Sequence, residues 1–313
     1  MFKFIKFFSE LSKIDVDIAG GKGASLGEMT KAGFLIPPGF VILASAFDRF
    51  LEETDLNVEV VAQLKKVNPK QTHTIDDASE ILRSLILKYP IPKDIEKEII
   101  TAHNKLKANY VAVRSSATAE DSSVASWAGE LESYLGVQKK DLLDSVKKCW
   151  SSLFTPRAIF YRIEKKMGGE KVSVAVVVQK MVESEVAGVC FTVHPVTQDR
   201  NQMVIEASWG LGESVVGGKV TPDCYVVDKK NFKIIDININ EQLTEIKRTG
   251  QITKEMPVSP VKAGKQCLSE KQILELAQIA KNIENHYGFP CDIEWALEKG
   301  KFYIVQSRPI TTL

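Results

Sequence analysis

The chain has 313 residues, of which 44% are hydrophobic and 26% are charged, and its formal net charge is +1. This composition is typical of a globular protein, and the length allows one large subdivided domain or two domains. Because the net charge is close to zero, we expect no nucleic acid and no membrane as a partner, and any anionic ligand must be held by local Lys, Arg or backbone N–H groups.

Helical patterns dominate the first half of the chain. ASLGEMTKA predicts a short helix that ends at Gly33, and GFVIL predicts a strand after a Pro-Pro turn. NYVAVR predicts a further strand, and the small residues of SSATAEDSSVASWAG predict a long loop after it. The remaining helical periodicity covers residues 44–53, 78–88 and 92–107 and the segments KKDLLDSVKKCWSSLF and TPRAIFYRIEKK.

Strands dominate from Lys171 onward. VSVAVVVQKMV is apolar almost throughout, as in a strand that is buried on both faces, and AGVCFTV, MVIEAS, DCYVVD and FKIIDIN follow it. A last long helix runs from Ser269 to about Tyr287, with a capping box at its start and Gly288 at its end. We therefore predict an α+β (mixed α/β) fold with two lobes, a helix-rich lobe over residues 1–168 and a strand-rich lobe over residues 169–313. A cleft between two lobes is a common ligand site.

The five cysteines are scattered and form no C-x-x-C pair. This pattern argues against a disulfide framework or a zinc site and favours a reducing compartment. The basic and apolar start, MFKFIKFFSEL, is interrupted by lysines, so we do not interpret it as a signal peptide. With no run of about 18 apolar residues, the sequence predicts a cytoplasmic protein.

Two segments carry cations next to residues that suit an anion. In AGGKGASLGEM, glycines surround Lys22 and lead into a helix, which favours phosphate binding, although the segment is not a Walker A motif. In VAVRSSATAED, Arg114 ends an apolar strand before a hydroxyl-rich loop. The alternative interpretations are a flexible turn with a solvated lysine, and an arginine that pairs with Glu120 or Asp121.

Polar residues also interrupt the apolar strands of the second half. Gln179 lies inside VVVQKMV, where a buried amide needs partners and could contact a base edge or only hold backbone. EASWGLGESVVGGKVTPD contains Glu206 and Glu213 in a glycine-rich stretch, which we interpret as a plain loop between strands.

The C-terminal stretch DIEWALEKGKFYIVQSRP predicts a hairpin with four regularly spaced polar residues. Alternation places Asp292 and Glu294 on one face of their strand, and Gln306 and Arg308 on one face of the next. A two-residue turn at Lys299–Gly300 would put these pairs on opposite faces of the sheet. A three-residue loop, or a five-residue loop with the same pairing, would put Glu294 opposite Gln306 and Asp292 opposite Arg308, and we predict this second register.

In that register the hairpin offers ligands for a hard cation. Two carboxylates and an amide oxygen (Asp292, Glu294 and Gln306) suit Mg²⁺, which keeps water and phosphate oxygens as its other ligands. Arg308 beside them would bind a phosphate. The alternative is a solvated sheet face with a cross-strand pair between Asp292 and Arg308.

Taken together and in this order, the motifs resemble the N-terminal ATP-binding domain of phosphoenolpyruvate synthase and pyruvate phosphate dikinase. The resemblance runs from about residue 15 to the end, and its motifs are GGKGASLGEM, PPGFVI, VRSSATAED, ASWAG, SLFTPRAIFYR, VVVQKMV, AGVCFT, GLGESVVGGKVTPD, DIEWAL and IVQSRPIT. It implies an ATP-grasp-like fold, in which two lobes hold Mg-ATP between them.

The resemblance also implies roles for individual residues. Lys22, Arg114 and Arg308 look like phosphate contacts with a catalytic role, and Gln179 looks like a nucleotide contact. Gly129 and Ser133 correspond to the loop that packs on the nucleotide. The hairpin residues Glu294 and Gln306 look like ligands of Mg²⁺ or ATP, supported by Asp292.

In the family that the chain resembles, this domain passes the β-phosphoryl group of ATP to a histidine on a swivelling domain, and AMP and phosphate form. The chain has no T-S-H-like segment and no pyruvate-binding domain after QSRPITTL. We therefore expect an ATP-dependent phosphotransferase module whose acceptor histidine lies on another domain or chain. One alternative is the ATP domain of a rifamycin-type antibiotic phosphotransferase, and another is a non-catalytic ATP-binding regulatory subunit.

Overall fold

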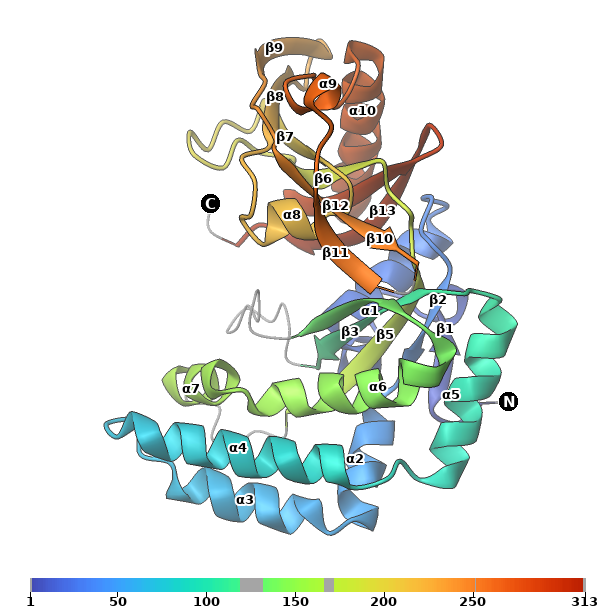
Figure 1. Ribbon diagram of the computed structural model, residues 1–313, viewed down its shortest axis with the longest axis vertical. Helices are drawn as coiled ribbons and strands as arrows, with labels where there is room; N and C mark the ends of the chain where they lie inside the picture. The colour runs from blue at the N-terminus through green and yellow to red at the C-terminus, as the bar shows by residue number, and fades with distance from the viewer. Residues whose placement is uncertain (1, 119–131, 166–171, 251, 312–313) are drawn as a thin grey trace. The chain divides into compact units, whose positions relative to one another are not determined.

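The computed structural model describes residues 2–118, 132–165, 172–250 and 252–311, and the chain divides into two compact units (Figure 1). The first unit comprises residues 1–28 and 38–181, and the second comprises residues 29–37 and 182–313. Within the described ranges, every pairing between named strands is antiparallel and helices accompany both main sheets. The predicted α+β class is therefore confirmed.

The first unit contains a five-stranded sheet. Its strands, in spatial order, are β1 (Ile5–Phe7), β2 (Gly39–Ile42), β5 (Val174–Lys180), β3 (Val111–Ala117) and β4 (Ser133–Val137). The helices of this unit are α2 (Ala44–Glu53), α3 (Leu56–Lys66), α4 (Thr72–Lys88), α5 (Lys93–Leu106), α6 (Leu142–Ser151) and α7 (Pro156–Glu164), with 3₁₀ turns η1 (Phe8–Glu10), η2 (Lys139–Asp141) and η3 (Ser152–Phe154). Figure 1 shows α4 lying between α3 and α6.

The two faces of this sheet differ in chemistry. Alternate residues of the central strand β5, such as Val176 and Val178, pack in a hydrophobic core that includes the fully buried Trp150 of α6. Burial of each such side chain stabilises the fold by about 1.5–3 kcal/mol relative to exposure. Residues between them, including Gln179, point to the other face. One face is therefore structural, and the other is the face on which polar residues of β3 and β5 gather.

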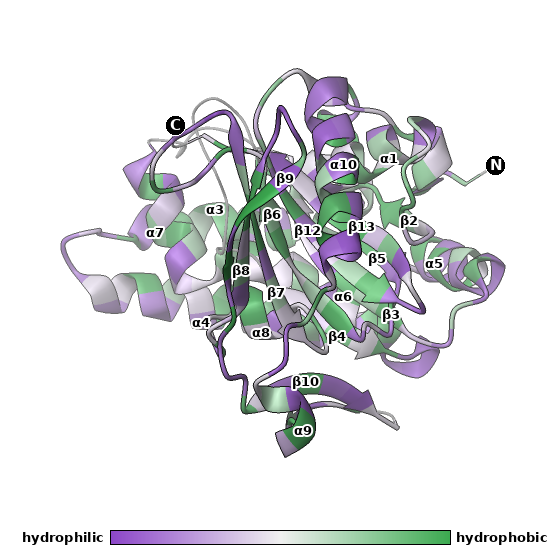
Figure 2. Ribbon diagram, turned by 90° about the horizontal axis from the view of Figure 1, so that it is seen from above, coloured by the Kyte–Doolittle hydropathy of each residue, from purple (hydrophilic) through white to green (hydrophobic). Residues whose placement is uncertain are grey.

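The second unit contains a six-stranded antiparallel sheet and a separate two-stranded one. The large sheet has the order β13 (Lys301–Pro309), β12 (Cys291–Glu298), β6 (Val186–Phe191), β7 (Gln202–Trp209), β8 (Asp223–Asp228) and β9 (Lys233–Asn238). The small sheet pairs β10 (Thr244–Thr249) with β11 (Ile252–Pro257), and the helices are α8 (Glu213–Val216), α9 (Pro260–Ala263) and α10 (Glu270–Tyr287). In Figure 2 strand β6 is largely green, and α10 shows hydrophilic residues on the side turned to the viewer.

The long helix α10 begins and ends as the sequence predicts. The Ser269 hydroxyl accepts a hydrogen bond from the Gln272 N–H, and the Gln272 side chain accepts one from the Ser269 N–H at 2.9 Å, which completes the capping box. Gly288 ends the helix at φ +78°. The buried positions of α10, among them Ile273 and Ala280, contact strands of the large sheet.

Three features differ from the sequence-based expectation. Helix α1 (Val16–Lys31) begins before the glycines rather than after them, because a helical segment precedes Gly20 and the helix resumes beyond a kink at that residue. The segment Leu56–Lys66, for which the sequence analysis predicts no helix, forms α3. The change from first to second unit lies after Met181 rather than at residue 168, because β5 pairs with β2 and β3 in the first unit.

Candidate functional site

The glycine-rich segment around Lys22 lies against the end of β3. Gly20 has φ 68° and ψ 169°, a backbone conformation that is almost restricted to glycine. A Cβ atom at Gly20 would lie 2.2 Å from Oγ of Ser116, and the N–H of Gly23 donates a hydrogen bond to the same oxygen at 3.3 Å. Glycine therefore permits a close approach that places Lys22 beside the last residues of β3.

Arg114 and Gln179 lie on the same face of the first unit's sheet. In the register of β3 with β5, Arg114 is opposite Val177 and Ala112 is opposite Gln179. Side chains alternate along each strand, so these positions share the face that is opposite to Val176 and Val178. Gln179 is only 2% exposed. The structure thus brings two of the predicted nucleotide contacts to one surface, next to the segment that carries Lys22.

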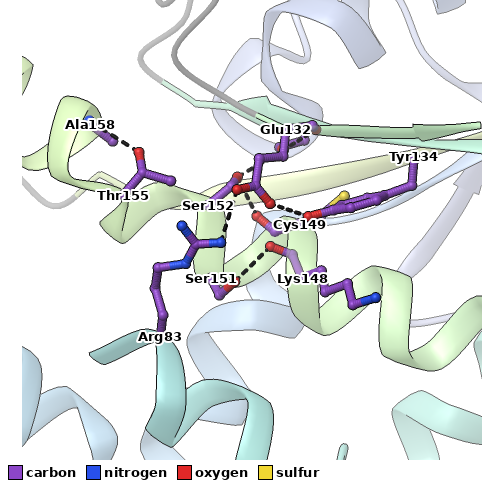
Figure 3. Close-up of polar contacts among 10 residues, drawn as sticks. Arg83, Glu132, Tyr134, Lys148, Cys149, Ser151, Ser152, Thr155 and Ala158 are labelled. Atoms are coloured by element: carbon purple, nitrogen blue, oxygen red, sulfur yellow. Dashed lines mark hydrogen bonds and ion pairs between the residues drawn. The ribbon is translucent and has the colours of Figure 1, made fainter. Parts of the chain in front are cut away.

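Ser133 opens β4 directly opposite Arg114. The preceding residue, Glu132, anchors this strand, because it accepts a hydrogen bond from the Arg83 guanidinium at 2.9 Å and another from the Tyr134 hydroxyl (Figure 3). Burial raises the pKa of Tyr134, and the hydrogen bond to Glu132 raises it further. Gly129, the other residue predicted in this loop, lies outside the described residues.

The C-terminal hairpin has the predicted pairing but not the predicted loop. Its turn contains two residues, Lys299 and Gly300, both with positive φ. A β-bulge between Glu294 and Trp295 shifts the register, so that Glu294 is opposite Gln306 and Asp292 is opposite Arg308. The expectation of a three-residue or five-residue loop is therefore wrong, whereas the expectation that the four polar residues share one face is confirmed.

Buried oxygen atoms without partners characterise this polar face. Asp292 is 8% exposed, and two guanidinium nitrogens of Arg308 contact its Oδ2 atom at 2.7 Å each. Its Oδ1 atom and the Oε1 atom of Gln306, which is 4% exposed, have no hydrogen-bond partner among the described residues. A buried acceptor without a donor is costly, so both oxygens favour a cation or an ordered ligand.

The electrostatics of Asp292 agree with such a site. Burial raises the pKa of the Asp292 carboxyl, the Arg308 guanidinium opposes that rise, and the neighbouring Glu294 adds to it. A divalent cation would offset both the burial and the repulsion between the carboxylates. The described residues contain no cluster of three or more His, Cys, Asp or Glu side chains arranged to hold a metal ion. Two carboxylates and an amide fit Mg²⁺, which needs few protein ligands.

Glu206 lies at the junction of two sequence expectations, since it belongs both to the predicted strand MVIEAS and to the stretch interpreted as a loop. In the structure it lies within strand β7, opposite Val189 of β6, so the loop interpretation is wrong at this residue. Burial raises the pKa of Glu206, and the Asp292 carboxylate raises it further, so the two acids lie near each other. The predicted strand MVIEAS already places it correctly, and a single acidic residue in such an apolar run is unusual.

The structure therefore brings the predicted residues together in two sets. Lys22, Arg114, Ser133 and Gln179 gather at the sheet of the first unit, and Asp292, Glu294, Gln306 and Arg308 gather on one face of the sheet of the second unit. In the part of the chain that the structure describes, no helix is both long and apolar enough to span a bilayer.

Comparison with known proteins identifies relatives along the whole chain. The family model described as "Pyruvate phosphate dikinase, AMP/ATP-binding domain" matches residues 16–313. The probable phosphoenolpyruvate synthase of Methanocaldococcus jannaschii is 49% identical over 319 residues, which cover 99% of this chain and 27% of that protein. The phosphoenolpyruvate synthase of Pyrococcus furiosus is 44% identical over 360 residues, covering 100% of this chain and 44% of that protein.

A second probable phosphoenolpyruvate synthase, from Methanothermobacter thermautotrophicus, is 45% identical over 320 residues, with 100% of this chain and 47% of that protein covered. The chain thus spans between about a quarter and a half of the length of these relatives. Among solved structures, D-alanine–D-alanine ligase from Bacillus anthracis aligns with 74% of this chain and 64% of that chain, at 10% identity and a TM-score of 0.27. A likeness this weak carries no argument about the fold.

Proposed function

Because the chain belongs to the family of the pyruvate phosphate dikinase AMP/ATP-binding domain, we propose that it binds Mg-ATP and acts as the ATP-dependent phosphotransferase module of a phosphoenolpyruvate synthase. The observation that carries the metal part of this proposal is the polar face of the second unit. There, the unpartnered oxygens of the buried Asp292 and Gln306 lie on the same face as the half-buried Glu294, which is directly opposite Gln306. Hard oxygen donors of this kind match the preference of Mg²⁺.

The residues of the chain take distinct roles in this function. Lys22, Arg114 and Arg308 hold phosphate oxygens and offset the charge that develops during transfer. Gln179 contacts the nucleotide, and Glu294 and Gln306 hold the cation with support from Asp292. Bound Mg²⁺ supplies charge neutralisation across neighbouring phosphate oxygens. Positioning and electrostatics account for most of catalysis in phosphoryl transfer, so the chain needs no covalent protein nucleophile of its own.

The proposed reaction transfers the β-phosphoryl group of ATP to a histidine nitrogen. The histidine nitrogen bonds to the β-phosphorus as the bond between that phosphorus and the oxygen bridging it to the α-phosphate breaks, so AMP leaves and the histidine carries the β- and γ-phosphates. Water then cleaves the β–γ bridge, which releases the γ-phosphate as phosphate and leaves the β-phosphoryl group on the histidine. The acceptor histidine belongs to another domain or another chain, and we place the protein in the cytoplasm, where its five free cysteines remain reduced.

The relatives favour this reaction over the alternatives. The three relatives described above are all named phosphoenolpyruvate synthase or probable phosphoenolpyruvate synthase. Their names support transfer to a histidine in such a synthase over transfer that ends on an antibiotic. The presence of Lys22, Arg114, Glu294, Gln306 and Arg308 supports an active module over a regulatory subunit.

The test is a calorimetric titration of ATP with and without Mg²⁺. We expect the wild type to bind ATP in a metal-dependent way, and Glu294→Ala to lose the metal dependence because it removes a carboxylate ligand. Glu298→Ala is a matched control, since Glu298 lies on the same strand but pairs with Lys301 at the tip of the hairpin. If Glu294→Ala binds Mg-ATP as tightly as the wild type, the assignment of Glu294 is wrong.

A further inference from the structure

Glu206 lies in the same row of the second unit's sheet as the proposed metal ligands. Register pairs Glu206 of β7 with Val189 of β6, Val189 with Glu294 of β12, and Glu294 with Gln306 of β13. Directly paired residues point to the same face of a sheet. The four side chains therefore stand in one line across four strands, with the short Val189 between the two glutamates.

The distance between strands decides whether Glu206 binds the ion directly or through a water molecule. Two strand spacings place the backbones of Glu206 and Glu294 about 9.5 Å apart. Glu294 and Gln306, the proposed direct ligands, are neighbours across one strand spacing, so an ion held between them lies beyond Glu294 and still farther from the backbone of Glu206. A metal-bound water that donates a hydrogen bond adds roughly 2.8 Å to the reach of the ion, which suits the wider gap. Glu206 is therefore placed for a water-mediated contact with the ion rather than a direct one.

The charges around Glu206 also indicate that a cation lies on this face of the sheet. No hydrogen bond or ion pair joins Glu206 to a residue within the described ranges, although Asp292 is near enough to raise its pKa. Arg308 is engaged with Asp292. A half-buried carboxylate beside other carboxylates is destabilised unless a cation or a donor lies on the same face. The unpartnered, more than nine-tenths buried oxygens of Asp292 and Gln306 provide an independent sign of a ligand there.

We propose that Glu206 is a positioning residue of the metal site, which accepts a hydrogen bond from a water molecule on the cation held by Glu294 and Gln306. This inference rests on the proposed function of the same face. Mg²⁺ releases its water reluctantly and keeps several water molecules when protein-bound, so such a contact orients the hydrated ion. Removal of an outer partner of this kind typically lowers metal affinity 10–100-fold.

The experiment titrates Mn²⁺, as a paramagnetic substitute for Mg²⁺, into the full chain with a non-hydrolysable ATP analogue, and follows free Mn²⁺ by electron paramagnetic resonance. We compare the wild type with Glu206→Gln, which keeps the shape of the side chain, and with Glu206→Ala. Asp236→Asn is the matched control, because Asp236 is an exposed carboxylate of the same sheet on β9, opposite Val226. Metal-free binding of the analogue serves as the check on folding.

We expect both Glu206 variants to bind Mn²⁺ 10–100-fold more weakly than the wild type while their metal-free affinity for the analogue stays unchanged. Asp236→Asn should match the wild type. If Glu206→Gln and Glu206→Ala bind Mn²⁺ like the wild type, or if they lose metal-free binding by the same factor, the positioning role is wrong and the proposed function stands. If the wild type binds no metal with the analogue, the proposed function itself fails.

Discussion

At the scale of single residues, both the backbone conformation and the packing at position 20 require glycine. Its backbone conformation is almost restricted to glycine, and a Cβ there would also meet the backbone oxygen of Ser116 at 2.4 Å. We expect Gly20→Ala to lower the free energy of unfolding by about 3 kcal/mol, as the sum of backbone strain and steric overlap. Urea denaturation measures this loss, and the same variant should bind ATP more weakly.

A second glycine separates the two contributions. Gly33 has φ +84° but no atom lies within 4 Å of the Cβ that alanine would add. Gly33→Ala should therefore cost only the backbone term, about 1–2 kcal/mol. Equal losses for Gly20→Ala and Gly33→Ala would contradict the argument that close packing on Ser116 determines the glycine at position 20.

At the scale of elements, the β-bulge in the hairpin β12–β13 is the feature that unites the polar residues. The turn alone would pair Glu294 with Val305, and the extra residue in β13 moves Gln306 into that place. Deletion of Val305 would remove the bulge and keep Glu294 opposite Gln306. We expect the deletion variant to retain metal-dependent ATP binding within a few-fold, as calorimetry can measure. Loss of binding in a folded variant would show that the bulge does more than set the register.

The elements also show what the sequence can and cannot predict. The capping box at Ser269 and the alternation in the hairpin are local signals. The first correctly predicted where α10 begins, and the second correctly predicted that the polar residues share one face. The bulge was not predictable, because a two-residue turn plus one extra strand residue gives the same pairing as a longer loop. Strand β5 was assigned to the wrong half, since an apolar strand does not reveal which sheet will accept it.

In the candidate site, too, the sequence predicts local relations between residues but not relations between distant strands. Residues at regular spacing in one hairpin, such as Asp292 and Arg308, could be placed on a common face from the sequence. Glu206 could not, because its relation to Glu294 depends on β6 lying between their strands, a non-local pairing that no local pattern encodes. The kink at Gly20 was also missed, because its cause is the approach of Ser116, which is distant in sequence.

At the scale of the whole molecule, a buried histidine links stability to pH. His103 is 5% exposed, its Nε2 atom has no hydrogen-bond partner within the described ranges, and burial, with a smaller effect of Lys139, lowers its pKa below 6.5. The folded state therefore disfavours the proton that the unfolded state accepts. This contribution to stability is complete above pH 6.5 and is lost as the pH falls below that value.

We test this linkage with urea denaturation of the wild type and of His103→Gln between about pH 8 and pH 5, a range that spans the ordinary pKa of histidine. The difference in unfolding free energy between the two proteins should be constant at the alkaline end, and the wild type should lose more stability than the variant as the solution is acidified. The subtraction removes the contributions of carboxylates such as Asp292 and Glu206, whose raised pKa values act in the opposite direction. Parallel pH profiles would rule out His103 as the source.

The hairpin register also restricts how the gene for this protein can change in length. Loss of one residue between Glu294 and Gln306 would turn Gln306 and Arg308 to the opposite face, unless the residue lost is the extra one in the bulge. Loss or gain of two residues keeps the face. Insertions and deletions in this segment should therefore survive selection in pairs of codons, while the loss of a single codon should persist only at the bulge.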